Sequence, residues 1–350
     1  MKNKNLFKHL DDNISILFSE DMGICSFYRL KKDKYKENGI QSRELEISYV
    51  RNKENEKITV FENKKIIIED ILKVHFLSGI NMVVLEISYG NDCTVKDIAN
   101  ITFIISRIKI RSNSSSNGKY ICSNIKYCQD ENTVEINSQE YIKNIVRNLV
   151  DYEKLDKYAM SKKIDVFHNL IVNQNDYNAP HKLYLYLTQG REYVSSYVND
   201  GSDVIENKVK SVHLKDSKRF FSSNGCAAVA TYDCSNKSFI ENEYRDNIFG
   251  AYFLIFLYVL YEVRMIKIYN LKMISEYNKD DAMIELRESM IYFNAICGFN
   301  VVSEEINYQS FYDNLYSAYG LDKLEKESQD NIKKLAEYVE KRKKKQTICL

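Results

Sequence analysis

Short apolar runs alternate with polar stretches through the first part of the chain, from residue 23 to residue 90. The runs are rich in Ile, Val, Tyr and Phe, and the stretches between them hold Asn, Gly and Lys. This pattern is typical of β-strands joined by turns. In KITVFENKKIII, two such runs flank Glu62, Asn63 and Lys64, which predicts a β-hairpin. We therefore expect an antiparallel sheet here.

Two helices are predicted to cover this sheet. Thr94 precedes VKDIANITFIISRIKI and can act as its N-cap, and Ser138 does the same for QEYIKNIVRNLV. Between residues 151 and 204 the pattern is ambiguous, except that HKLYLYLT after Pro180 favours a strand. Further strands are predicted at KSVHL, KRFFS and CAAVATY, the last preceded by the turn residues Ser223–Gly225.

From about Glu241 onward the spacing of apolar residues is that of helices. The first helix is expected from about Tyr244 to Tyr277, and Asp280 begins another. That second helix carries a heptad seam, and the final helix, LDKLEKESQDNIKKLAEYVEKRKKK, has a single apolar face. The residues of the seam are Met283, Leu286, Met290, Phe293 and Cys297, and those of the face are Leu321, Leu324, Ile332, Leu335 and Val339.

These patterns predict an α+β protein. An N-terminal domain, residues 1–236, would hold a mainly antiparallel sheet with covering helices, and residues 237–350 would form a bundle or coiled coil of long helices with a basic tail. The helix through Phe249–Tyr261 is apolar on every face and needs a cover, either from the first domain or from another subunit. The residues expected at a self-association interface are Phe253, Leu257, Tyr261, Met283, Leu286, Met290, Phe293, Leu335 and Val339.

Composition and charge narrow the class of protein. One proline and 11 glycines in 350 residues exclude collagen-like and linker-rich chains, and 44% hydrophobic residues are enough for a sizeable core. Fifty basic and 49 acidic residues give a net charge of +1, so no overall field recruits nucleic acid or anionic membrane. Such partners could be met only by the basic tail, whose candidate phosphate contacts are Lys341, Arg342, Lys343, Lys344 and Lys345.

Location is predicted from the cysteines and the chain start. Eight cysteines are scattered without a regular framework, and Asp11 and Asp12 interrupt the N-terminal segment before an export signal could form. The longest uncharged apolar stretch, Phe249–Tyr261, is shorter than the roughly 20 residues that a bilayer span needs. We therefore expect a cytoplasmic protein with reduced thiols.

Motifs for catalysis, cofactors or metals are missing from the sequence. It contains no Gly-rich phosphate loop, no GxSxG and no HExxH, and its cysteine pairs do not have zinc spacing. We therefore predict no catalytic residue, no metal ligand and no cofactor. One alternative stays open, in which acidic residues of the sheet hold Mg²⁺ for phosphodiester hydrolysis. Those residues are Glu44, Glu46, Glu69, Asp70 and Glu86.

Two C-terminal segments, ENEYRDNIFGAYFLIFLYVLYEVRMIKI and FYDNLYSAYGLDKLEKESQDNIKKLAEYVEKRKKK, carry a resemblance to a known family. A long helix that opens in an apolar run and is followed by charged helices resembles the cytosolic architecture of CorA-like divalent-cation transporters. That family adds two membrane spans and a Gly-Met-Asn loop, whereas the nearest string here is Gly298-Phe299-Asn300. The resemblance implies a soluble relative that oligomerises through helices, and it transfers no functional residue.

The sequence therefore predicts a non-catalytic binding protein that self-associates through its C-terminal helices and binds an unidentified small molecule or protein. The first alternative is the metal-dependent nucleic-acid or nucleotide hydrolase, with the basic tail holding the substrate. The second is a membrane-associated protein that uses Phe249–Tyr261 at the bilayer surface.

Overall fold

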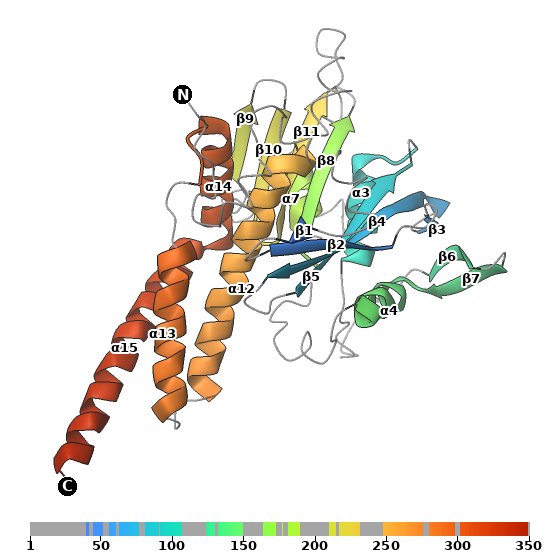
Figure 1. Ribbon diagram of the computed structural model, residues 1–350. Coiled ribbons are helices and arrows are strands. Elements are labelled where there is room, and N and C mark those ends of the chain that lie inside the picture. Colours follow the sequence, from blue (N-terminus) through green and yellow to red (C-terminus); the bar gives the residue numbers. More distant parts are fainter. Residues whose placement is uncertain are drawn as a thin grey trace, which may run out of the picture. The chain divides into compact units, whose positions relative to one another are not determined.

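The chain is an α+β protein, described here by a computed structural model (Figure 1). It forms two compact units that divide between Gly250 and Ala251, which we call the sheet unit and the helical unit. The predicted boundary at residue 236 lies outside the described residues. These are 40–41, 45–51, 56–60, 63–76, 81–90, 92–106, 124–129, 132–149, 164–172, 177, 181–189, 210–214, 217–231, 248–275, 280–297 and 302–348.

The first sheet of the sheet unit is antiparallel, as predicted, and has seven strands built around one long strand, β4. One edge of β4 pairs with β5, and its other edge pairs first with β3 and then with β2. The strands are β1 (Ile40–Gln41), β2 (Leu45–Arg51), β3 (Glu56–Thr59), β4 (Lys65–Phe76), β5 (Asn81–Tyr89), β6 (Asn124–Gln129) and β7 (Asn132–Asn137).

The predicted hairpin is confirmed as the connection between β3 and β4. Ile58 pairs with Ile66, and the amide of Val60 donates to the carbonyl of Lys64 at 2.8 Å. Asn63 closes the turn with a φ of 65°, a backbone conformation that asparagine tolerates better than most side chains. Ile58 and Ile66 are buried in the core of this sheet.

Helix α3 (Val95–Ile105) follows β5 and begins as predicted at Thr94. Its buried residues contribute to two separate cores: Ile101 packs with the strands of the first sheet, whereas Ala99 packs with the second sheet. Helix α4 (Ser138–Leu149), predicted from Ser138, adds Tyr141 to the first of these cores. The ring of Tyr141 lies 5.0 Å from that of Tyr127 on β6.

The second sheet has four strands in the order β8-β11-β10-β9. The strands β9 (Lys210–Leu214), β10 (Ser217–Ser222) and β11 (Gly225–Thr231) confirm the three predicted runs. Strand β8 (Val166–Val172) comes from the part of the chain where the sequence pattern was ambiguous, and it pairs with β11 in parallel. This sheet is therefore mixed, unlike the first.

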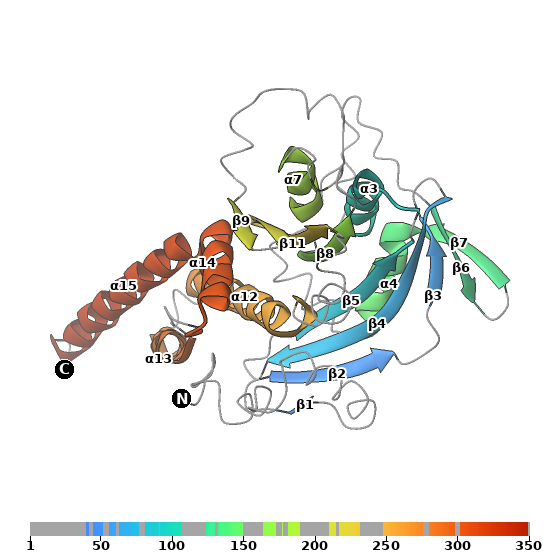
Figure 2. The same cartoon turned by 90° about the horizontal axis from the view of Figure 1, so that it is seen from above.

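The segment HKLYLYLT was predicted as a strand, and that prediction was wrong: it forms helix α7 (His181–Gln189). Leu183, Tyr184 and Leu187 recur at helical spacing and are buried against the second sheet and α3. The ring of Tyr184 stacks on Phe220 of β10 at 4.3 Å. Figure 2 shows α7 beside α3 over the second sheet. Alternating Leu and Tyr resembles a strand locally, and packing decided in favour of the helix.

The helical unit contains four helices in the described residues: α12 (Phe253–Ser275), α13 (Asp280–Cys297), α14 (Ile306–Tyr319) and α15 (Leu321–Ile348). Helix α12 follows the short π-helix η4 (Ile248–Tyr252), in which the backbone leaves helical geometry at Gly250. The predicted helix start at Tyr244 lies outside the described residues. Gly320 ends α14 in the left-handed conformation, which glycine adopts without steric cost. The N-cap residue of α14 is Glu305, and its backbone amide donates to the Ser303 hydroxyl at 3.0 Å.

The helices of this unit form a bundle, and their directions follow from cross-helix contacts. Tyr269 of α12 donates to the backbone carbonyl of Ser289 on α13 at 3.3 Å. Its ring lies 5.6 Å from that of Phe293, which also contacts Tyr261, so α12 and α13 run antiparallel. Long helices packed side by side confirm the predicted bundle, while a coiled coil stays a prediction.

Candidate functional site

The apolar residues predicted at a self-association interface are buried within the single chain. Those of α13 lie against α12 and α15, which accounts for the heptad seam without a second subunit. These side chains form a core within one chain, and a self-association interface at these residues stays a prediction. The buried residues are Phe253, Leu257, Tyr261, Met283, Leu286, Met290, Phe293 and Leu335.

The remaining predicted residues lie towards the end of α15. Lys341 is exposed. Helix α15 continues through Ile348, so the basic tail is helical. The side chains of Val339, Arg342, Lys343, Lys344 and Lys345 lie outside the described part of the structure.

A buried carboxyl group lies in the middle of the helical unit. Glu262 of α12 is 2% exposed. The hydroxyl of Tyr312 on α14 donates to Glu262 Oε2 at 3.3 Å. Burial, and secondly the charge of Glu325, raises the pKa of Glu262 well above its ordinary value, although hydrogen bonds from Tyr258 and Tyr312 oppose the rise. The group is therefore held in its neutral form more strongly than an exposed glutamate.

A second carboxylate continues this cluster towards the surface. The hydroxyl of Tyr316 on α14 donates to Glu325 Oε2 on α15 at 2.7 Å. Burial raises the pKa of Tyr316, with its hydrogen bond to Glu325 as the next cause. Tyr312 and Tyr316 lie one helical turn apart, and their ring centroids are 5.7 Å apart. The cluster joins three helices through tyrosine–carboxylate pairs.

A partly buried amide pair joins α12 and α15. Asn331 of α15 donates to Asn270 Oδ1 of α12 at 3.0 Å, and Asn331 is 6% exposed. Glu262 of α12 interacts with Glu325 of α15, and eight residues further along α12, Asn270 bonds to Asn331 of α15. Residue numbers therefore rise in the same direction along both helices, so α12 and α15 run parallel. A buried amide pair favours one register of neighbouring helices over others, because any shift leaves polar groups without partners.

The buried face of α15 differs from the predicted one. Leu321 and Leu335 are buried as expected, but Ser328 and Asn331 complete the stripe, whereas Ile332 is only half-buried. A search for apolar spacing misses polar seam residues. The spacing of seven from Leu321 to Ser328 to Leu335 was the signal available in the sequence.

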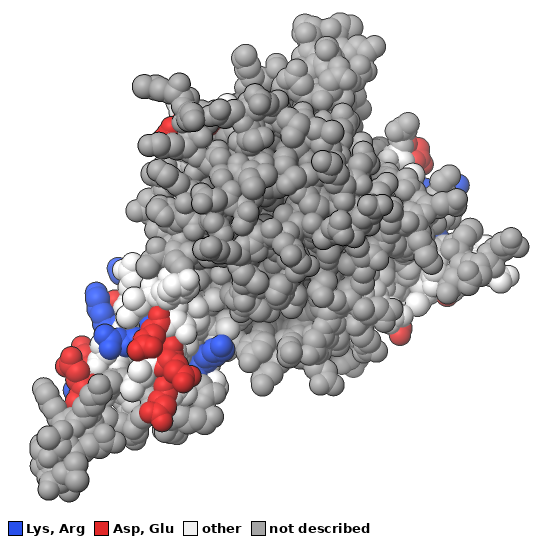
Figure 3. All heavy atoms as spheres, viewed as in Figure 1, with Lys and Arg blue, Asp and Glu red and all other residues white. Residues whose placement is uncertain are grey.

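The opposite, solvent-facing side of α13 carries an ordered stripe of its own. Asp281, Glu285, Glu288 and Tyr292 are all exposed and follow spacings of four, three and four residues. Tyr292 is 68% exposed and its neighbour Ile291 is 45% exposed. Figure 3 shows carboxylate side chains gathered over this part of the helical unit, with lysine and arginine side chains beside them. We call the four residues the outer stripe of α13.

The outer stripe combines charge and exposed apolar surface. Among the residues that the structure describes, no basic side chain makes an ion pair with Asp281, Glu285 or Glu288. The stripe was not predicted, although its spacing is visible in DDAMIELRESMIY, because the apolar seam is the stronger periodic signal of this helix. Its geometry fits a helix of opposite charge laid alongside α13.

The acidic residues proposed for a hydrolytic metal site are spread along the first sheet. Strand register places Glu86 opposite Asp70, whereas Glu46 lies opposite His75. These positions are five residues apart on β4, about 17 Å along an extended strand. Glu44 lies outside the described residues. Of the side chains that the structure describes, no three His, Cys, Asp or Glu are grouped to hold a metal ion.

The buried His168 of β8 is a further titratable group. Burial lowers the pKa of His168 to about 4, although a hydrogen bond with the backbone of Leu187 opposes this decrease. Its ring lies 6.4 Å from Tyr89. The imidazole is therefore neutral near pH 7 and packs as part of the core.

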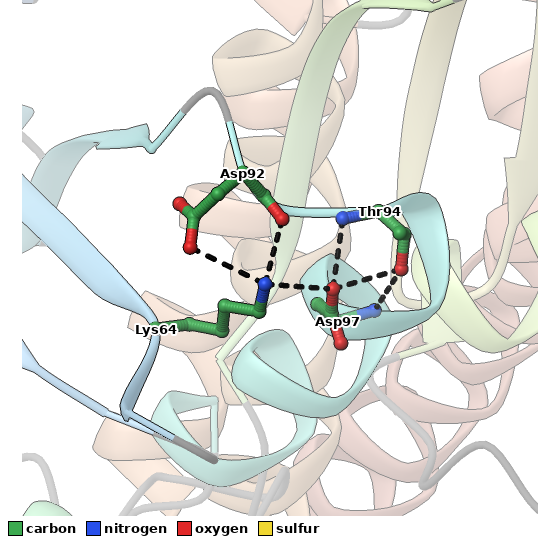
Figure 4. A network of polar contacts seen from close by, with 4 residues as sticks. All are labelled: Lys64, Asp92, Thr94 and Asp97. Atoms are coloured by element: carbon green, nitrogen blue, oxygen red, sulfur yellow. Dashed lines mark hydrogen bonds and ion pairs between the residues drawn. The ribbon is translucent and has the colours of Figure 1, made fainter.

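An exposed polar network holds the start of α3 to the β3–β4 hairpin (Figure 4). Lys64 Nζ donates to the carbonyl oxygen of Asp92 at 2.7 Å and to its carboxylate at 3.2 Å, and it lies 3.8 Å from Asp97 Oδ2. Thr94 and Asp97 form a reciprocal capping box. The hydrogen bond to Asp92 raises the pKa of Lys64. The ammonium group occupies the centre of this network, whose role is to join sheet and helix.

Replacing Thr94 with alanine tests this junction. The backbone amide of Asp97 would lose its 3.2 Å hydrogen bond to the Thr94 hydroxyl. We expect a loss of about 1 kcal/mol in the free energy of unfolding, measured by urea denaturation. Thr94→Ser, which keeps the hydroxyl, should remain near wild type. Equal losses for both variants would show that the cap contributes nothing.

No helix in the described part of the chain is long and apolar enough to cross a bilayer. Comparisons with protein-family models, with curated proteins and with solved structures gave no match.

Proposed function

We propose that this protein is a non-catalytic binding protein that self-associates through its C-terminal helices. The sheet unit would serve as the part that binds a ligand or partner. The resemblance of the C-terminal segments to the CorA-like cytosolic architecture implies the same habit of assembling through helices, and it stays a prediction.

The observation that carries this proposal is the outer stripe of α13. The seam of this helix is used within the chain, yet its solvent-facing side repeats at heptad spacing and exposes Tyr292 and Ile291. Exposed aromatic residues beside charged ones are a frequent feature of protein-binding surfaces. A surface of this kind on a rigid helix supports binding to another helix.

Light scattering coupled to size-exclusion chromatography tests self-association. We expect a mass above the 41.1 kDa of one chain, increasing with loading concentration. Tyr292→Asp should lower the fraction of oligomer at least tenfold, because it places charge at the apolar end of the stripe. A wild-type protein that stays monomeric at every concentration would contradict the proposal.

Ile306→Asp is the matched control. Ile306 is 85% exposed and begins α14, away from the outer stripe in sequence and at a position where an acidic residue is favoured. The control should keep the wild-type mass. Loss of oligomer in both variants would indicate a general effect of added charge and would count against a specific role for α13.

A further inference from the structure

Resting on the proposed self-association, we propose that the outer stripe of α13 binds the basic end of α15, Lys341–Lys345, from a second copy of the chain. The stripe is acidic, helical and exposed, and the end of α15 is basic and helical. The two segments are complementary in charge.

The basic segment of α15 is shorter along its helix axis than the acidic part of the stripe. Asp281 to Glu288 rises about 10 Å along α13, and Lys341 to Lys345 rises about 6 Å along α15. Helical periodicity places Lys341, Lys344 and Lys345 on one side of α15. Lysine side chains are long enough to reach carboxylates beyond the about 6 Å of helix axis that these residues span. One turn of α15 can therefore lie along the acidic part of the stripe.

The same chain cannot supply this basic segment to its own stripe. The opposite side of α13 packs against α12 and α15 through residues such as Met283 and Met290. Helix α15 is continuous from Leu321 to Ile348. A continuous helix that packs on one side of α13 cannot turn back to its far side. The occupant has to come from another molecule.

Two copies of the chain can satisfy each other. In a two-fold dimer, the stripe of each copy would receive the basic segment of its partner, so that the contact occurs twice. Tyr292 would add its ring at the end of the acidic run, where a lysine ammonium can lie over an aromatic face. Because exposed ion pairs are individually weak and are screened by salt, the dimer should weaken as ionic strength rises.

A charge-swap experiment tests this inference on the full-length protein. One variant carries Glu285→Lys and Glu288→Lys, and the other carries Lys341→Glu, Lys344→Glu and Lys345→Glu. Each variant alone would bring like charges together, so we expect its dimer dissociation constant to rise at least tenfold in sedimentation equilibrium. An equimolar mixture pairs each reversed segment with its new complement and should restore association in both contacts.

The outcomes separate this inference from the proposed function. Circular dichroism spectra matching that of wild type would show that the changed surface residues leave the helices intact. If wild type dimerises and both variants dimerise equally well, the stripe–tail contact is overturned while self-association stands. If only the tail variant loses association, the tail binds another surface and the inference also fails. If wild type is monomeric at all concentrations, both proposals fail.

Discussion

Gly225→Ala is expected to destabilise the sheet unit by about 3 kcal/mol or more, because the new methyl group has no space and the backbone conformation suits only glycine. Gly225 begins β11 with a φ of 152° and pairs with Val166 of the parallel strand β8. A Cβ built there would collide with the carbonyl oxygen of Val166 and lie 2.7 Å from its Cγ2. The backbone of β8 cannot move away without giving up its pairing with β11.

Thermal unfolding measures this effect, with a decrease in melting temperature of about 6 °C or more for a unit of this size. Gly320→Ala is the matched control. Gly320 has a φ of 68°, but no atom lies within 4 Å of an added Cβ. It should lose only about 1–2 kcal/mol from left-handed strain. If Gly225→Ala unfolds at the wild-type temperature, β8 and β11 do not pair as described.

Glu262→Gln is expected to remove a decline in stability as pH rises. Burial raises the pKa of Glu262, so the folded protein keeps this proton at pH values where the unfolded chain has released it. The stabilising effect of the neutral form is complete below the unfolded pKa of about 4.3, and it is lost as pH rises through the folded pKa. Within that window the wild-type free energy of unfolding should fall by about 1.4 kcal/mol per pH unit relative to the variant.

Urea denaturation at a series of pH values from 4 upward gives this comparison. Glutamine keeps the size of the side chain and an acceptor for the Tyr312 hydroxyl, so the variant should match wild type at the acidic end and be more stable than wild type above it. Glu325→Gln removes the second cause of the raised pKa of Glu262, the charge of Glu325, and should narrow the pH range over which the stability declines. Parallel curves for wild type and Glu262→Gln would show that Glu262 does not titrate as an isolated buried acid.

Local signals predicted the elements that depend on a few neighbouring residues. Thr94 caps α3 through contacts within three residues, and Asn63 closes the hairpin within one turn. The left-handed end of α14 likewise requires only Gly320. Each of these choices is a short-range balance of hydrogen bonds and backbone sterics, so the sequence contains the necessary information.

Non-local packing explains the errors. The turn Ser223–Asn224 was expected, but its role in holding β8 was not: Asn224 Nδ2 donates to the carbonyl of Ile164 at 3.0 Å, across 60 residues. The helical state of α7 likewise depends on burial of Tyr184 against Phe220. Such contacts join segments that are far apart in the sequence, and no local pattern in either segment indicates the other.

The candidate site divides in the same way. The sequence by itself determined that a long C-terminal helix ends in five basic residues and that α13 has a heptad seam, because charge and periodicity are properties of one segment. Only the tertiary structure decided that the side chains of this seam pack inside the chain, that Glu262 and Asn331 are buried, and that the acidic side of α13 is exposed. Burial depends on which helices meet and at what register, and that is fixed by the sum of many weak contacts between distant residues.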